Sequence, residues 1–319
     1  MNTIMPVRAA GAATLRDKLK SLPFYLLPHH AISRVVHAAA RWRAPWWKNA
    51  LTGWFIRRYD VDLSEALEPD PRAYPNFNAF FTRALRPDAR PLPPNPEVVV
   101  SPADGTISAI GDIDGDTIVQ AKGRAFTVRE LLGGDETLAS RFHGGRFATI
   151  YLSPADYHRV HMPASGRLKE MIHVPGRLFG VAAFSVRAVD RLFARNERMI
   201  AVFDTTYGPM AVIMVGAINV ASIETVWAGE ITPPRGRRIR HWFYHGNEAR
   251  SFQRGDEIGR FNLGSTVIVL FGPGQIAWLP ELLAEQKVRM GQALGHHEAR
   301  SDSKVVPLEP YLRNRSQSQ

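Results

Sequence analysis

The chain has 319 residues, a net charge of +10 and no cysteine. Hydrophobic residues make up 45% of the sequence and aromatic residues 10%, which is enough apolar material for a packed core and excludes an intrinsically disordered chain. Without cysteine, disulfides, zinc–thiolate sites, iron–sulfur clusters and a cysteine nucleophile are all excluded. The length allows one large domain with appendages, or two smaller domains.

The positive charge is concentrated near the N-terminus. Residues 1–58 hold ten Lys and Arg and a single acid, Asp17, which is a net charge of +9. The rest of the chain holds 30 basic and 29 acidic residues and is nearly neutral. A uniformly basic surface would favour nucleic acid as the partner. A basic segment on a neutral body instead indicates attachment to an anionic membrane surface, and no nucleic-acid partner is expected.

Residues 1–60, called the leader below, are expected to form short amphipathic helices that bind a membrane. Apolar residues recur at helical spacing from Leu15 to Tyr59, and Pro28 and Pro45 divide the region. Four tryptophans lie among its basic residues: Trp42, Trp46, Trp47 and Trp54. Such Trp and Lys/Arg clusters are typical of helices at headgroup depth. A helical domain packed on the body is the alternative, and both interpretations can hold together.

No segment reaches the roughly 18 consecutive apolar residues that a membrane span requires. The apolar run Leu22–Leu27 contains Pro23 and lacks a small-residue cleavage site, so no secretory signal is expected. We therefore expect a peripheral protein on the cytoplasmic face of the cell membrane.

The remaining sequence predicts a connector, a β-rich body and a tail. Residues 61–97 are rich in proline, residues 98–285 are expected to form the body, and residues 286–319 a polar tail. Short β-branched or aromatic runs predict strands at Val98–Val100, Thr106–Ile110, Thr117–Ala121, Phe147–Leu152, Met210–Val215, Ala221–Trp227 and Thr266–Phe271. One helix is expected over Val186–Arg195. Because regular βαβ alternation is missing, the predicted fold class is α+β, mostly antiparallel, with the helical leader at its N-terminus.

Three short segments of the body carry candidate chemistry. Asp104 lies in a turn between strands, His158 and His161 precede a proline, and Gly264–Ser265 leads into a strand. Taken singly, each is also typical of a turn or of structural residues. Two histidines without a further cluster of ligands do not predict a metal site. Together, Asp, His and Ser supply the parts of a charge relay that activates a serine, although the sequence does not show that they converge.

These segments resemble bacterial phosphatidylserine decarboxylase proenzymes whose processing motif is Leu-Gly-Ser-Thr. The resemblance runs from about Phe77 to about Pro273 and more loosely through the leader. The matching blocks include Phe80–Arg83, Ser101–Gly105, Gln120–Gly123, Tyr157–Pro163, Leu192–Arg198, Ile223–Gly229 and Gly259–Thr266.

The resemblance implies self-cleavage between Gly264 and Ser265, giving a β chain, residues 1–264, and an α chain, residues 265–319, that stay associated. Asp104, His161 and Ser265 would form the relay for cleavage, which converts Ser265 into a covalent pyruvoyl group. That group, the one cofactor implied, would form a Schiff base with phosphatidylserine, release CO2 and yield phosphatidylethanolamine. His158 is assigned to the decarboxylation step, with a structural role as the alternative.

Two other functions compete with this interpretation. A membrane-associated Ser-His-Asp hydrolase would use the same three residues on an external ester, and a binding module would use none of them. The implied partners are phosphatidylserine and an anionic membrane surface. A homodimer is left open by the sequence.

Overall fold

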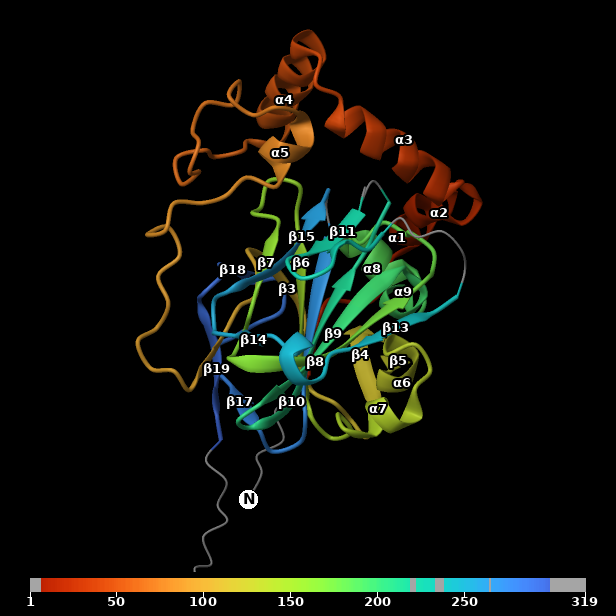
Figure 1. Ribbon diagram of the computed structural model, residues 1–319. Coiled ribbons are helices and arrows are strands. Elements are labelled where there is room, and N and C mark those ends of the chain that lie inside the picture. Colours follow the sequence, from red (N-terminus) through yellow and green to blue (C-terminus); the bar gives the residue numbers. More distant parts are fainter. Residues whose placement is uncertain (1–6, 219–221, 233–237, 264, 299–319) are drawn as a thin grey trace, which may run out of the picture.

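The computed structural model describes residues 7–218, 222–232, 238–263 and 265–298 (Figure 1). It shows an α+β protein in which helices α1–α5 lie over one end and one side of an antiparallel β body. The predicted fold class is therefore confirmed.

The leader forms four helices, and Pro28 and Pro45 divide it as predicted. They are α1 (Leu15–Ser21), α2 (Pro23–Leu26), α3 (His29–Arg41) and α4 (Pro45–Tyr59), and the short α5 (Phe77–Phe81) follows in the connector. Pro23 and Pro45 each stand at the first position of a helix, where their missing N–H costs no hydrogen bond. In the described part of the chain, no helix is both long and apolar enough to cross a bilayer.

The body is built around a ten-stranded sheet. Its main path runs in the order β1-β3-β6-β16-β10-β9-β8-β13, with β14 pairing to β8 and β18 to β3, and every pairing is antiparallel. The strands are β1 (Arg8–Ala9), β3 (Gly105–Asp112), β6 (Arg146–Leu152), β8 (Gly166–Val174), β9 (Arg198–Thr205), β10 (Gly208–Val215), β13 (Arg240–Phe243), β14 (Ser251–Phe252), β16 (Ser265–Phe271) and β18 (Lys287–Val288). All residues of the central strand β16 are buried.

Three smaller sheets flank the large one. They are formed by β12 (Gly229–Glu230), β11 (Ser222–Thr225), β15 (Glu257–Asn262) and β7 (Arg159–His161); by β17 (Ile276–Trp278), β19 (Ala293–His297) and β2 (Val98–Val100); and by β4 (Thr117–Ala121) and β5 (Arg124–Thr127). The short helices of the body are α6 (Val128–Leu131), α7 (Glu136–Ser140), α8 (Ala183–Ala188) and α9 (Leu192–Arg195), and Gly246–Glu248 forms a 3-10 turn.

Two details differ from the sequence prediction. The single helix expected over Val186–Arg195 is wrong, because α8 ends at Ala188 and α9 begins only after Arg191, whose φ of 50° is incompatible with a continuous helix. The body also extends past residue 285, since β18 pairs with β3 and β19 pairs with β2. Residues 299–319 of the expected tail lie outside the described residues.

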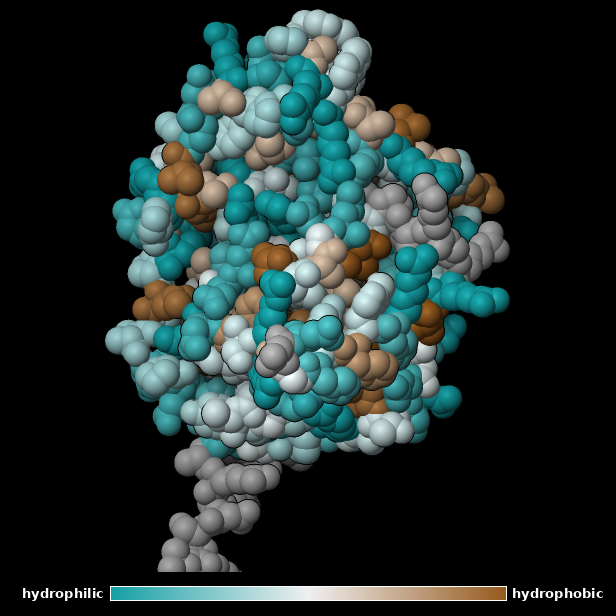
Figure 2. All heavy atoms as spheres, in the orientation of Figure 1, coloured by the Kyte–Doolittle hydropathy of each residue, from teal (hydrophilic) through white to brown (hydrophobic). Residues whose placement is uncertain are grey.

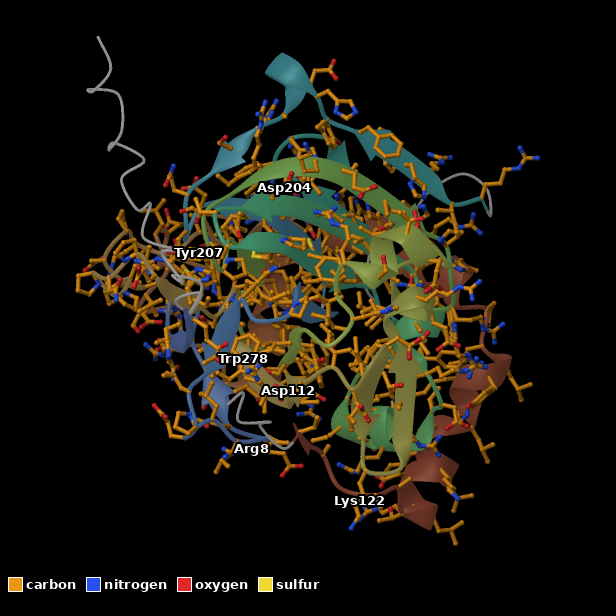
Figure 3. All side chains as sticks on the ribbon, turned by 90° about the horizontal axis from the view of Figure 1, so that it is seen from below. Arg8, Asp112, Lys122, Asp204, Tyr207 and Trp278 are labelled. Atoms are coloured by element: carbon orange, nitrogen blue, oxygen red, sulfur yellow. The ribbon has the colours of Figure 1, made fainter. Side chains whose placement is uncertain are left out.

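The end of the body away from α4 is held by contacts between the large sheet and its neighbours. Figure 3 looks onto this end and shows Arg8, Asp112 and Trp278 gathered on it. Trp278 donates its indole N–H to the carbonyl of Gly111 at 3.3 Å, and Arg8 donates to the carbonyl of Leu282. The three candidate motifs lie at the opposite end, under α5.

Candidate active site

The motif with His158 and His161 and the motif with Ser265 lie close together, at the place where the chain passes between the large sheet and the four-stranded sheet. Strand β6 leads through residues 153–158 into β7, and β15 leads through residues 263–264 into β16. Ser265 on β16 pairs with Leu152 on β6, and the backbone N–H of Phe261 donates to the carbonyl of His158 at 3.0 Å. The two connections therefore run side by side, with His158 at the end of one and Ser265 at the end of the other.

The first motif joins the same region through backbone contacts. The N–H of His161 donates to the carbonyl of Pro102 at 2.8 Å, and β3 pairs with β6 directly after Gly105. A Cβ on Gly105 would lie 2.3 Å from the carbonyl oxygen of Tyr151, so only glycine allows this approach. All three motifs thus converge on one end of the body.

Ser265 is a buried residue whose hydroxyl is free. Its exposed fraction is 1%, and its Oγ has no hydrogen-bond partner among the described residues. A buried hydroxyl left unpaired is costly. Just before it, Leu263 adopts a φ of 95°, which is strained for a residue with a branched side chain. Gly264 itself lies outside the described residues.

The strained Leu263 is held by the helical layer. Its side chain is buried in an aromatic cluster whose other buried members come from α3, α4, α5 and Val61: Ala40, Phe55, Val61, Phe77, Phe80 and Phe81. The turn that precedes Ser265 is therefore packed against the leader and the connector rather than against solvent.

His158 is fully buried and has one free ring nitrogen. Its Nδ1 lies 2.7 Å from the carbonyl oxygen of Asp156, and because a carbonyl only accepts, Nδ1 carries the proton. Its Nε2 is then an unprotonated acceptor, with no partner among the described residues. Burial lowers the pKa of His158 to about 3, so the ring is neutral near pH 7. The ring therefore offers a free acceptor nitrogen, while its low pKa makes it a weak base in this buried state.

Both ring nitrogens of His161, in contrast, are occupied. Nδ1–H donates to the carbonyl of Gly255 at 2.8 Å, and Nε2 accepts from the hydroxyl of Tyr157 at 3.0 Å. Burial lowers the pKa of His161, and burial also raises the pKa of Tyr157 well above its ordinary value. The histidine is neutral, but its acceptor nitrogen is already used by a phenol that stays protonated.

Asp104 is part of an ion-pair network with the connector. Its carboxylate accepts two hydrogen bonds from the guanidinium of Arg90 and one, at 2.8 Å, from the N–H of Met290. Arg90 also bonds Glu65 at 2.8 Å. Within the part of the chain that the structure describes, no hydrogen bond joins Asp104 to His161 or His161 to Ser265. The three residues assigned to the relay lie in one region, with no direct hydrogen bond between them among the described residues.

A cavity of about 490 Å³ opens between the connector and the body. Asp104, Gly105 and Tyr157 line it from the body, and Arg83 and Arg90 line it from the connector. Sequence reasoning did not single out the two arginines as site residues. The signal that could have found Arg83 is its place in the run Phe80–Arg83, which is one of the blocks that carry the family resemblance.

Comparison with known proteins places the chain among self-processing enzymes. The family model described as phosphatidylserine decarboxylase matches residues 77–296, and a second model, PSD, matches residues 19–60. A protein from Alkalilimnicola ehrlichii is 64% identical over 263 residues, covering 82% of this chain and 91% of its own length. One from Pseudomonas fluorescens is 54% identical over 288 residues (89% and 100%), and one from Azotobacter vinelandii 53% over 285 residues (88% and 99%). Each is named a phosphatidylserine decarboxylase proenzyme.

The matches define a pyruvoyl-dependent carboxy-lyase that is made as a zymogen. The chain belongs to the phosphatidylserine decarboxylase family. The residues present fit the implied pyruvoyl group, because the serine that would yield it is buried, lies at the head of a core strand and has no hydrogen-bond partner among the described residues.

Proposed function

We propose that this chain cleaves itself between Gly264 and Ser265 and then decarboxylates phosphatidylserine at a membrane surface. The activity follows from the family, and the assignment of residues is the proposal. The observation that carries it is the free, buried Oγ of Ser265 directly after the strained Leu263. A hydroxyl without a hydrogen-bond partner is available to attack, and backbone strain before it is relieved when the chain is cut.

For cleavage, the first candidate base is His161, oriented by Asp104. In this arrangement Ser265 Oγ–H gives its proton to the imidazole, the oxygen attacks the carbonyl carbon of Gly264, and an ester replaces the peptide bond. Loss of the Ser265 α-proton then breaks the ester and frees the new C-terminus of the β chain. The dehydroalanine left at residue 265 takes up water and releases ammonia, which leaves the pyruvoyl group. To act so, His161 must first give up its hydrogen bond from Tyr157.

A second candidate base, His158, is favoured by its free nitrogen. Its Nε2 is buried and without a partner among the described residues, so no hydrogen bond has to be broken before it receives a proton. In that case Asp104 acts indirectly, by fixing Arg90 and the turn beside the site. The two candidates make opposite predictions for single histidine variants.

After cleavage, the pyruvoyl group supplies the electron sink for decarboxylation. The chain's own contribution is proton transfer in a site that excludes water. His158 Nε2 can take a proton from the substrate ammonium and return it to the α-carbon that loses CO2. Its complete burial keeps that proton from exchanging with solvent during the step.

Intact-mass analysis of the purified protein tests the proposal. The wild type should give two species, residues 1–264 and 265–319, and the smaller should have a blocked N-terminus. Ser265→Ala should remain one chain of 35.6 kDa. A wild type that stays uncleaved would refute the proposal and favour the alternative, a Ser-His-Asp hydrolase. A serine-directed phosphonate should then label the intact protein.

The same mass measurement distinguishes the roles of His158 and His161. If His161→Ala and Asp104→Ala stay uncleaved while His158→Ala is processed but turns over poorly, His161 is the base for cleavage. If His158→Ala stays uncleaved and His161→Ala is processed, the base is His158.

We also propose that the leader holds the protein on the cytoplasmic face of an anionic membrane. Apolar side chains on α1–α4 and the α3–α4 connection are exposed to solvent: Leu15, Leu19, Leu22, Tyr25, Leu26, Val35, Trp42, Trp46 and Trp54. Figure 2 shows apolar residues on the outer edge of α2 and α3. The one acid of residues 1–58, Asp17, is bound by Arg187 of the body, so it does not offset the basic residues that face outward.

The same helices reach the site. Phe55 of α4 packs against Phe81 of α5 in the aromatic cluster that contains Leu263. The leader is therefore in contact, through this cluster, with the residue that stands two positions before Ser265. A homodimer is left open as a proposal, and the oligomeric state is measured directly by sedimentation.

A further inference from the structure

Arg83 is a buried cation with few partners. It follows α5, and its exposed fraction is 5%. Its Nη2 donates to the carbonyl of Ala155 at 3.2 Å, and its guanidinium lies 5.7 Å from the ring centre of Phe80. Its Nε is buried without a hydrogen-bond partner, and no carboxylate lies within ion-pair distance among the described residues.

Other buried arginines in this protein are satisfied. Arg90 is held by Asp104 and Glu65, and Arg198 donates to four backbone carbonyl groups. A buried charge without such partners is costly, and burial lowers the pKa of Arg83 accordingly. A site that retains this cost is typical of one that binds an anion.

The guanidinium lines the cavity of about 490 Å³ beside the candidate active site. The same cavity is lined by Tyr157, which directly precedes His158, and by Gly105. Gly105 lies at the start of β3, and one strand separates β3 from β16, where Ser265 stands. With neighbouring strands about 4.8 Å apart, the part of the cavity wall formed by Gly105 is about 10 Å from Ser265.

We propose that Arg83 binds the phosphodiester of the phospholipid substrate and so makes the enzyme select serine that carries a phosphate. A guanidinium matches phosphate oxygens in geometry and charge. The substrate carboxylate is the less suitable ligand, because a cation that stabilised it would hold the ground state and oppose loss of CO2. The phosphate keeps its charge throughout the reaction, and only Cα, Cβ and the ester oxygen separate it from the amine.

The other charged groups of the cavity are compatible with an anion at Arg83. Asp104 and Glu65 are already bound by Arg90. Asp156 accepts from the N–H of Ser153, and burial raises its pKa, which favours its neutral form. Asp62 is bonded to Ser64, and Asp60 lies at the end of α4. Lys287, exposed at the cavity, has no ion pair among the described residues and is a second cation for the same phosphate.

This proposal rests on the proposed decarboxylase activity. The test uses processed enzyme in detergent and compares two substrates, phosphatidylserine and an O-alkyl serine of equal chain length, which lacks the phosphate. Arg83→Met should be cleaved normally by mass, raise KM and lower kcat/KM for phosphatidylserine by about 10- to 100-fold, and leave kcat/KM for O-alkyl serine nearly unchanged. Arg83→Lys should restore part of the loss, and Lys287→Met should show a smaller selective loss. The exposed Arg129, changed to Met, is the matched control and should alter neither substrate.

An equal loss for both substrates would mean that Arg83 only supports the fold, and no loss would refute the site. If Arg83→Met does not fold, competition in the wild type decides. Glycerophosphoethanolamine should inhibit turnover of phosphatidylserine far better than ethanolamine does, and equal inhibition would overturn the proposal. Failure of the wild type to be cleaved would count against the proposed processing instead, so the two failures are distinguishable.

Discussion

The imidazole ring of His158 packs on the phenyl ring of Phe81, with ring centres 4.0 Å apart. One residue belongs to the β body and the other to α5, which packs in turn against α4. The burial that keeps His158 neutral is therefore supplied in part by the helical layer. Any movement of the helices on a membrane acts directly on this histidine.

We expect Phe81→Leu to raise the pKa of His158 from about 3 toward its ordinary value of 6.5. Burial is the main cause of the low pKa, and the smaller leucine admits water beside the ring. Titration of the histidine by NMR in uncleaved Ser265→Ala protein measures this. Phe77→Leu, in the same aromatic cluster, is the control and should leave the pKa of His158 in place. Identical titration curves with and without Phe81 would contradict the assignment.

The low pKa of His158 also predicts acid sensitivity. The unfolded chain binds a proton on this residue near pH 6.5, whereas the folded protein does so only near pH 3. Stability from the neutral histidine is thus fully present above pH 6.5 and is lost at about 1.4 kcal/mol per pH unit as the pH falls toward 3. Between pH 6.5 and 5, the wild type should lose about 2 kcal/mol more free energy of unfolding than His158→Gln, as measured in urea. If the free energy of unfolding fell equally in the wild type and in His158→Gln, the low pKa of His158 would be disproved.

Asp104 is paired with Arg90, so variants of the two residues can distinguish a direct role of this carboxylate in cleavage from an indirect one. Asp104→Asn removes the charge that faces a largely buried guanidinium, so we expect it to lower the free energy of unfolding by about 2 kcal/mol and to block cleavage. If Asp104 acts by positioning, Arg90→Met should block cleavage as well. Cleavage of Arg90→Met at the wild-type rate would show that the carboxylate itself serves the reaction. Glu65→Gln, at the more exposed end of the network, is the milder control.

Leu263→Gly should slow cleavage. Glycine accepts the positive φ without strain, and the loss of the side chain frees the turn from the aromatic cluster. Removing the strain stabilises the fold by roughly 1 to 2 kcal/mol, and losing the buried side chain destabilises it by about 2 kcal/mol. The free energy of unfolding should therefore change little, and the effect should appear in the rate of cleavage. A time course of cleavage after refolding measures it. A rate equal to that of the wild type would show that strain contributes nothing.

The exposed tryptophans of the leader should contribute to membrane binding. Trp42 and Trp46, 50% and 66% exposed, pack edge to face and offer their apolar surface to the headgroup region. Changing both to alanine should weaken sedimentation with phosphatidylserine-containing vesicles about 10-fold and leave cleavage intact. Leu283→Ala, an exposed apolar residue on the body, is the control. Undiminished vesicle binding would place the attachment elsewhere.

Local pattern determined much of this protein. Prolines at positions 23 and 45 set the helix starts, because a ring without an N–H is tolerated only in a first turn. Runs of β-branched residues located β2, β4 and β16 within a residue, because such side chains favour the extended backbone of a strand. Strand β8 was missed because charged residues such as Lys169 and Glu170 interrupt its apolar run, and the body beyond residue 285 was missed because β18 and β19 are short and polar.

The candidate residues Asp104, His158, His161 and Ser265 were all named from the sequence, and their motifs do converge. Their hydrogen-bond partners were not predicted, because a hydrogen bond depends on three-dimensional position and not on residue type alone. Only the tertiary structure showed that Asp104 is bound by Arg90 and that His161 is engaged at both ring nitrogens. It also showed that, among the described residues, His158 Nε2 has no hydrogen-bond partner and the buried Arg83 has no carboxylate partner. The sequence determined which groups the site contains; long-range packing decided which of them are free to react.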